Sequence, residues 1–375
     1  MRPLDRDTAL ALNKRLLHNL VSDSTDTAAG EMRLPAETFC CPRRLARERE
    51  HLFTRVPQPV AFSAEIAAPG SFMALDVLDT PVLLTRDGAG DLYAFINSCA
   101  HRGAALTSGS GRRGRLVCPF HGWTYGLDGR LASRPGDAYF STPAEECSLH
   151  PLPVSEKYGL VVVGTSSSLS ADQVDTALDE IGPELASFAL HTYRPIERRQ
   201  LNVEANWKLV TDLSLESYHF RSLHRDSVAR VLAPNAIVDT WSRHSRWAFP
   251  LTTIRRLEDL DESLWPDSIE GSCTYTLYPG VMVIVNALGA QMIRAEPGDT
   301  PGHSRVIYAG VARGDCDLEE ARQAYDFGGD VFAGEDLPIA GQCQRGLVAS
   351  QRDLLLGRNE PLLQFWHALW RAAAG

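Results

Sequence analysis

The sequence predicts an α+β protein of two domains, in which an all-β domain precedes a domain of antiparallel strands flanked by helices. Three observations predict this fold. Short β-rich runs separated by Gly, Asp and Asn turn signals fill the chain from about 59 to 164. The small, polar stretch 165–171 has the composition of a linker. Beyond it, helical spacings of apolar residues alternate with further strand-like runs.

The expected elements follow in chain order. Amphipathic helices are predicted at 6–21 and 43–54, and strands at 81–85, 92–96 and 159–163. In the second domain we predict helices at 172–190 and 206–224, a strand at 193–204, strands at 275–277, 281–286, 292–295 and 305–312, and helices at 317–326 and 336–356. The expected division is therefore N-terminal helices at 1–55 that pack on the second domain, an all-β domain at 56–165 and the α+β domain at 166–375.

Composition narrows the class of protein. The 375 residues are 44% hydrophobic and 22% charged, which is enough apolar material for substantial cores. The formal charge is −10 and no stretch gathers the basic residues into a groove, so a nucleic-acid partner is not expected. No apolar run approaches the ~20 residues of a membrane span, and residues 1–7 lack the apolar segment of a secretory signal. The eight cysteines show no disulfide framework, which predicts a soluble cytoplasmic protein with reduced thiols.

Two Cys/His pairs stand out in the all-β domain. Cys99 and His101 are followed by Cys118 and His121, so that each of two loops supplies one thiolate and one imidazole. A zinc finger would order two cysteines before two histidines. The order found here suits a two-iron cluster with two thiolates on one iron and two imidazoles on the other. A structural zinc, or four unrelated residues in a β domain, is the alternative.

The stretch from Cys99-Ala-His-Arg-Gly to Cys118-Pro-Phe-His-Gly-Trp-Thr-Tyr resembles the Rieske [2Fe–2S] domain of the Rieske non-haem iron oxygenases. The resemblance implies that Cys99 and Cys118 hold one iron of the cluster, and that His101 and His121 hold the other.

A second group of metal-binding residue types lies in the second domain. Glu216 precedes His219 by three residues, which places both on one face of a helix, and His224 follows five residues later. On a straight helix the two histidines would lie about 140° apart, so a distorted helix end or a passage into a loop is needed to bring both to one metal. Two histidines and a carboxylate form the facial triad of non-haem iron. The alternative is one core and one surface histidine.

This segment also resembles the family. Asn206-Trp207-Lys208 and Glu216-x2-His219-x4-His224 are similar to its catalytic helix, which implies that His219 and His224 bind the mononuclear iron. Glu216 would link an iron-ligating histidine to His121 of a neighbouring subunit. One departure is Leu213, where many relatives have Asn, and this puts in doubt a side-chain amide near the iron.

The carboxylate ligand must come from further along the chain. The segment from Gly334 to Leu347 resembles the closing helix of the family, in which the acid at the position of Asp336 binds iron. We choose Asp336, with Glu335 and Asp330 as the second choices.

The resemblance implies the terminal oxygenase, or alpha subunit, of a system that uses dioxygen and electrons from an NAD(P)H-dependent reductase, with or without a ferredoxin. The cofactors would be a [2Fe–2S] cluster and Fe(II). A homotrimer is implied, with or without a beta subunit. The reaction would be aromatic-ring hydroxylation, or monooxygenation or N-dealkylation of an amine. A Rieske electron-transfer or redox-sensing protein without oxygenase activity is the alternative, although decay of the second centre would be expected to erase His219, His224 or Asp336.

Substrate contacts should come from the strands between His224 and Asp336. Aromatic residues there could hold a ring or surround a quaternary ammonium, or could be ordinary core; they are Trp241, Trp247, Phe249, Tyr275, Tyr278, Phe327 and Phe332. Arginines there could bind a substrate carboxylate or simply solvate strand edges; they are Arg243, Arg246, Arg255, Arg256 and Arg294. Glu rather than Asp at position 216 is a pattern that we associate with family members acting on quaternary amines.

Overall fold

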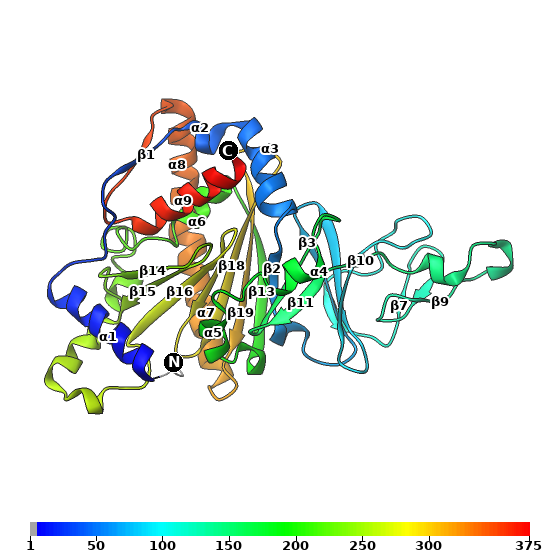
Figure 1. The fold of residues 1–375 in the computed structure, drawn as a ribbon, viewed down its shortest axis with the longest axis horizontal. Helices are drawn as coiled ribbons and strands as arrows, with labels where there is room; N and C mark the ends of the chain where they lie inside the picture. Colours follow the sequence, from blue (N-terminus) through cyan, green and yellow to red (C-terminus); the bar gives the residue numbers. More distant parts are fainter. Residues whose placement is uncertain (1–5) are drawn as a thin grey trace. The chain divides into compact units, whose positions relative to one another are not determined.

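The computed structural model describes residues 6–375, which form two compact units (Figure 1). One unit comprises residues 54–179, and the other joins the chain up to residue 53 with residues 180–375. Residues 1–5, most of the stretch predicted to lack a secretory signal, lie outside the described residues. The predicted α+β fold is confirmed. Within residues 6–375, no helix is both long enough and apolar enough to cross a membrane.

The unit of residues 54–179 consists mainly of antiparallel strands. A five-stranded sheet has the order β10-β5-β4-β3-β6, and two three-stranded sheets have the orders β11-β12-β2 and β7-β8-β9. The strands are β2 (Gln58–Phe62), β3 (Ser71–Val77), β4 (Thr80–Arg86), β5 (Leu92–Ile96), β6 (Ser110–Arg112), β7 (Leu116–Val117), β8 (Thr124–Tyr125), β9 (Leu131–Ser133), β10 (Pro151–Leu152), β11 (Val154–Lys157) and β12 (Leu160–Val163).

Two apolar clusters stabilise this unit. One contains Val60, Val82, Leu84 and Val161, each fully buried, and joins the β2–β12 sheet to the five-stranded sheet. The other lies beneath the loops that carry Cys99 and Cys118 and is built from both cysteines and from larger side chains, among them Phe95, Trp123 and Tyr125. The loops that carry the Cys/His pairs therefore rest on a packed base.

The predicted linker at 165–171 lies inside this unit instead of between domains. The helix that follows it, α4 (Ala171–Asp175), begins with a capping box at Ser170 and packs against β11. Ser155 Oγ donates to Asp175 at 2.8 Å, and Lys157 Nζ lies 2.7 Å from the same carboxylate. Because these bonds tie α4 to the sheet, the chain leaves the unit only after residue 179.

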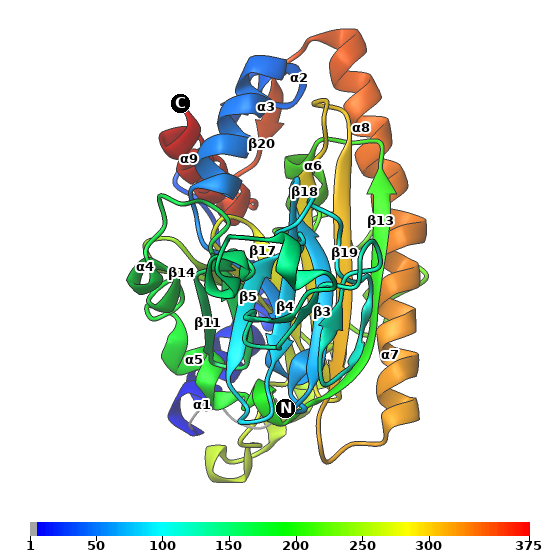
Figure 2. The ribbon, with the colours of Figure 1, turned by 90° about the vertical axis from the view of Figure 1, so that its right-hand side faces the viewer.

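The larger unit is centred on a seven-stranded antiparallel sheet with the order β13-β19-β18-β17-β16-β15-β14. Consecutive strands pair from β14 to β19. The first of the seven along the chain, β13, forms the edge of the sheet next to β19 (Figure 2). The strands are β13 (Arg194–Val203), β14 (Ile237–Thr240), β15 (Ser245–Pro250), β16 (Gly271–Leu277), β17 (Val281–Val285), β18 (Gly289–Pro297) and β19 (Ser304–Ala312).

Helices cover this sheet. Of these, α7 packs on β19 and β13, α6 on β18, and α1 on β14 and β15. A small sheet, β1 (Met32–Leu34) with β20 (Leu354–Leu356), ties the N-terminal segment to the C-terminal one. The helices are α1 (Arg6–Val21), α2 (Glu37–Cys40), α3 (Pro42–Glu48), α5 (Gly182–Ser187), α6 (Trp207–Asp212), α7 (Leu318–Val331), α8 (Leu337–Ser350) and α9 (Pro361–Ala374).

The helix predicted at 206–224 is wrong beyond residue 212. Asn206 caps α6 as predicted, its side chain accepting from Lys208 N at 3.0 Å. After Asp212 the chain turns, and the Glu216 carboxylate accepts the backbone N–H groups of Tyr218 and His219. The amides of Ser214 and Leu215 bond to carbonyls three residues earlier, which ends α6, and the bonds to Glu216 keep the amides of Tyr218 and His219 from resuming the helix. The helix predicted at 172–190 is likewise replaced by the short helices α4 and α5.

The Asn206-Trp207-Lys208 motif anchors α6 to the N-terminal helices. Lys208 and Glu48 are both 1% exposed and form an ion pair. Trp207 Nε1 donates to the same carboxylate at 3.0 Å, and Asn206 Nδ2 donates to the Phe39 carbonyl at 3.1 Å. The Glu48 carboxylate thus accepts from both Lys208 and Trp207, and these buried bonds hold α6 against the N-terminal helices.

Candidate metal centres and active site

Each of the two Cys/His loops contains the same kind of backbone turn. Gly103 and Gly122 follow the two histidines, have φ of +78° and +74°, and donate to the carbonyls of Cys99 and Cys118 at 2.9 and 3.0 Å. A left-handed backbone at these positions favours glycine. The turn therefore gives a sufficient reason for glycine at both positions.

The side chains of these loops form an inner pair and an outer pair. Cys99 and Cys118 are each 3% exposed, whereas His121 is exposed and His101 is half-buried. The two histidines face each other, with their Nδ1 atoms 3.1 Å apart. Among residues 6–375, the group of three ligand-type side chains that could hold a single ion lies elsewhere, in the larger unit. Two separate pairs fit a two-iron cluster.

Tyr125 is a site residue that the sequence prediction missed, although it ends the quoted motif. Its hydroxyl oxygen accepts the Ala100 N–H at 3.1 Å and lies 3.2 Å from Cys99 Sγ. Burial raises the pKa of Tyr125 well above its usual value, so the hydroxyl stays protonated and can donate to the sulfur. Hydrogen bonds to a ligating sulfur tune the potential of such a cluster.

The larger unit brings His219, His224 and Asp336 together, as predicted. One ligand atom from each lies within 4.8 Å of the others. Asp336 Oδ1 is 3.1 Å from His224 Nε2 and 3.7 Å from His219 Nε2, and it is buried with no hydrogen-bond partner in the described structure. A buried carboxylate oxygen without a donor is costly, so the position calls for a cation.

A carboxylate bonds to the Nδ1 atom of each imidazole, and the opposite nitrogen, Nε2, faces Asp336. The Nδ1 of His219 bonds to Glu216, and the Nδ1 of His224 lies 2.7 Å from Glu335 Oε2. When both Nδ1 atoms donate, both Nε2 atoms turn a lone pair toward Asp336. Burial lowers the pKa of His224, but the carboxylates of Asp336 and Glu335 outweigh it and raise that pKa. When a metal ion replaces the proton that this raised pKa favours, the two Nε2 atoms and the Asp336 oxygen offer three ligand atoms to one divalent ion.

A π-helical turn places the two acids side by side. Residues Phe332–Asp336 form this turn between α7 and α8, and Pro338 lies in the first turn of α8. In an α-helix consecutive side chains point about 100° apart. The wider turn lets Asp336 face both histidines while Glu335 reaches the far side of His224. Ser227 Oγ also donates to Glu335 at 2.9 Å. Glu335 therefore supports His224, and Asp330 is exposed.

A cavity of about 280 Å³ opens against this triad. Four of the seven predicted aromatic residues line it, namely Trp247, Phe249, Phe327 and Phe332. Phe220 also lines it and was missed, because it lies in the turn that the sequence pattern assigned to a helix. Leu213, the departure from the family pattern, lines it as well. Trp241, Tyr275 and Tyr278 do not line it.

None of the five predicted arginines lines this cavity. Arg246 is bound by Glu184 and Asp239, and Arg294 lies 3.4 Å from Glu296. The other three contact surface partners: Arg243 stacks on Tyr278, Arg255 pairs with Glu258, and Arg256 pairs with Glu270. Of the two roles that the sequence left open for these arginines, their positions do not support binding of a substrate carboxylate in this cavity.

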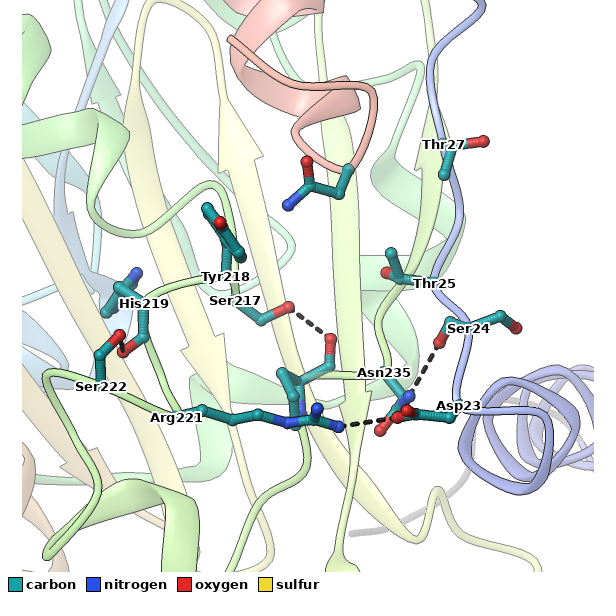
Figure 3. Close-up of a pocket in the computed structure, with 12 residues that line it drawn as sticks. Asp23, Ser24, Thr25, Thr27, Ser217, Tyr218, His219, Arg221, Ser222 and Asn235 are labelled. Carbon is teal, nitrogen blue, oxygen red and sulfur yellow. Dashed lines mark hydrogen bonds and ion pairs between the residues drawn. The ribbon is translucent and has the colours of Figure 1, made fainter.

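A larger polar groove of about 700 Å³ lies on the other side of His219 (Figure 3). The strap of residues 23–27 forms one wall and the 217–222 turn forms the other. Arg221 bridges the walls through Asp23 at 2.7 Å. Tyr218, 71% exposed, also lines the groove. His219 is the one residue that lines both the groove and the aromatic cavity.

Two family models match the chain. Residues 190–375 match the ring hydroxylating alpha subunit (catalytic domain), and residues 56–144 match the Rieske [2Fe-2S] domain. The chain is 28% identical over 313 residues to the carnitine monooxygenase oxygenase subunit of Acinetobacter pittii, which covers 80% of this chain and 81% of the relative. It is 32% identical over 198 residues to the chloroplastic choline monooxygenase of Beta vulgaris. That match covers 51% of this chain and 44% of the relative, so the chain spans less than half of this relative's length.

Solved structures share the fold. A quaternary ammonium Rieske monooxygenase in complex with L-carnitine matches with a TM-score of 0.77 and 22% identity, over 93% of this chain and 96% of that one. Naphthalene 1,2-dioxygenase from Rhodococcus sp. matches with a TM-score of 0.72 and 17% identity, over 97% of each chain. Both the all-β unit and the larger unit therefore have the architecture of these structures.

Proposed function

Because the chain belongs to the alpha subunits of the Rieske non-haem iron oxygenases, we propose that it is a terminal oxygenase that hydroxylates a quaternary ammonium compound. The observation that carries the proposal is the unpartnered Asp336 oxygen, which faces two imidazole nitrogens at the wall of an aromatic cavity. The names of the relatives, choline, glycine betaine and carnitine monooxygenases, support the substrate class.

In this proposal Cys99, Cys118, His101 and His121 hold the [2Fe–2S] cluster, and His219, His224 and Asp336 hold the mononuclear iron. When bound, the two centres supply single electrons and the activation of dioxygen. The residues of the chain orient the ligands and the substrate. Glu216 and Glu335 hold the two imidazoles in the ligating tautomer, and the buried cavity positions the substrate and excludes water.

We further propose a homotrimer in which the Rieske unit of one subunit serves the iron of the next. The polar groove beside Tyr218 and His219 is the docking surface that we assign to it, since His219 lines both this groove and the cavity. Glu216, bonded to His219, would complete the path from His121 of the neighbouring subunit. The electron source would be an NAD(P)H-dependent reductase, with or without a ferredoxin. The predicted cytoplasmic location stays a prediction, consistent with eight free cysteines.

A single-turnover experiment tests the activity. The iron-loaded protein is reduced with dithionite, mixed with dioxygen and choline, carnitine or glycine betaine, and the products are identified by mass. We expect one oxygen atom to be incorporated into a quaternary amine. His219→Ala should abolish the product while leaving the absorption of the cluster unchanged. If the wild-type cluster is reduced and reoxidised without product, the chain is an electron carrier and the proposal is wrong.

A further inference from the structure

Resting on the proposed function, we infer that the substrate combines a permanent cation with a neutral polar group, such as a hydroxyl, and carries no carboxylate. The inference comes from the charges and the shape of the cavity of about 280 Å³ beside His219, His224 and Asp336. This volume is below the ~300–1,000 Å³ of pockets for drug-sized ligands, so the substrate is small.

Aromatic rings beside the histidines form the cation-binding end of the cavity. The Phe220 ring lies 5.8 Å from the ring of His224 and 6.0 Å from that of Trp247, and the Trp247 and Phe249 rings are 4.5 Å apart. All three aromatic side chains are at least 94% buried. A desolvated ring attracts a quaternary ammonium through its negative face.

Strand alternation keeps arginine out of the cavity. On β15, Trp247 and Phe249 line the cavity, whereas Arg246 and Ala248, which alternate with them, do not. On β18, Gln291 and Ile293 line it and Arg294 does not. Because successive side chains point to opposite faces of a sheet, both arginines point away from the cavity. Among the described residues that line it, none is Lys or Arg. A substrate carboxylate would therefore be buried without a counter-charge.

The charges around the metal position also favour a cationic substrate over one with a carboxylate. Asp336, Glu216 and Glu335 contribute three carboxylates, one more than the charge of a divalent ion. A net negative site attracts a cationic substrate and repels an anionic group.

Neutral polar side chains form another part of the cavity wall. Ser272 and Thr274 come from β16, Gln291 from β18, and Asn286 from the turn before β18. Hydroxyl and amide groups can pair with a substrate hydroxyl in either direction, whereas they only partly compensate a buried carboxylate.

Binding to the iron-loaded protein under argon tests the inference without turnover. Calorimetry would compare choline with glycine betaine, which has a carboxylate in place of the hydroxymethyl group, and with 3,3-dimethylbutan-1-ol, the uncharged analogue of choline. We expect choline to bind at least tenfold more tightly than either. If glycine betaine binds as well as choline and both are oxidised, the inference fails and the proposed function stands. If no quaternary amine is bound or oxidised, both fail.

A positive charge added to the cavity wall should weaken the preference for choline over glycine betaine. Gln291→Lys is expected to shift the ratio of choline to glycine betaine affinity at least tenfold toward glycine betaine. Gln323→Lys adds the same charge at an exposed position of α7 and should leave the ratio unchanged. Circular dichroism checks folding, and Thr274→Lys on β16 serves if Gln291→Lys does not fold. An unchanged ratio in a folded cavity variant, or an equal shift in the control, would overturn the inference.

Discussion

The Nδ1 atom of His219 and that of His224 each bond to a carboxylate. The two carboxylates differ in how far they lie from their histidine along the chain. Glu216 is three residues from its partner, whereas Glu335 is 111 residues from His224. The sequence pattern identified Glu216 and offered Glu335 only as a second-choice ligand. A carboxylate at Nδ1 orients the ring and strengthens the other nitrogen as a ligand. Both imidazoles therefore reach the metal position already oriented.

We predict that Glu335→Gln weakens iron binding about 10- to 100-fold, the usual cost of removing such a partner. Glutamine can still accept the Nδ1–H of His224 but lacks the charge that strengthens this bond. Iron retained after dialysis against a graded chelator measures the change. Glu319→Gln, at an exposed position of α7, is the matched control. Equal retention in Glu335→Gln and wild type would show that Glu335 does not support the site.

At the level of elements, the position of Asp336 depends on how α7 lies on the sheet. The Tyr308 and Tyr325 rings are 4.8 Å apart, and each hydroxyl bonds to the backbone carbonyl of the other residue. Gly310 makes this packing possible, because a Cβ there would lie 2.2 Å from the Tyr325 ring. The π-helical turn continues directly from α7, so the packing on β19 sets where Asp336 points.

Gly310→Ala is therefore expected to destabilise the protein by about 1–3 kcal/mol, the usual cost of overpacking. It should also lower iron occupancy, since α7 must move. Gly346→Ala in α8, where an added Cβ has no neighbour within 4 Å, is the control and should be neutral or slightly stabilising. Thermal unfolding and iron analysis measure both effects. A Gly310→Ala protein as stable as the control would contradict this account of the packing.

The helix α9 shows what the sequence prediction overlooked at this scale. Pro361 lies in its first turn, and Leu362, Leu363, Trp366 and Trp370 follow at helical spacings and are buried. No element was predicted there, although this pattern was available. The turn that replaces the predicted helix after α6 is different, because it contains hydrogen bonds made by Glu216 that the apolar spacing does not reveal.

For the molecule as a whole, the proposed trimer makes a prediction about mixed subunits. If the cluster of one subunit serves the iron of the next, Cys118→Ala and His219→Ala subunits, each inactive alone, should restore activity when co-expressed. About a quarter of the wild-type rate is expected for random assembly in a closed ring.

His219→Ala co-expressed with His224→Ala is the control, because both subunits then lack the same centre and no activity should return. Product formation measured by mass distinguishes the cases. A mixture of Cys118→Ala and His219→Ala that stays inactive, although size analysis finds mixed trimers, would rule out transfer between subunits.

The chemistry of the two centres could be predicted from the sequence. Cys99, His101, Cys118 and His121, and likewise His219 and His224, are close in the chain, so their spacing, together with its resemblance to a family pattern, predicts what they can hold. The choice of Asp336 over Glu335 and Asp330 came from resemblance, and the folded chain shows that its carboxylate reaches both histidines. The support of His224 by Glu335 and the direction of the arginines could be seen only in the folded chain. The physical reason is that strand pairing and helix packing join residues more than a hundred positions apart, and local patterns carry no record of those contacts.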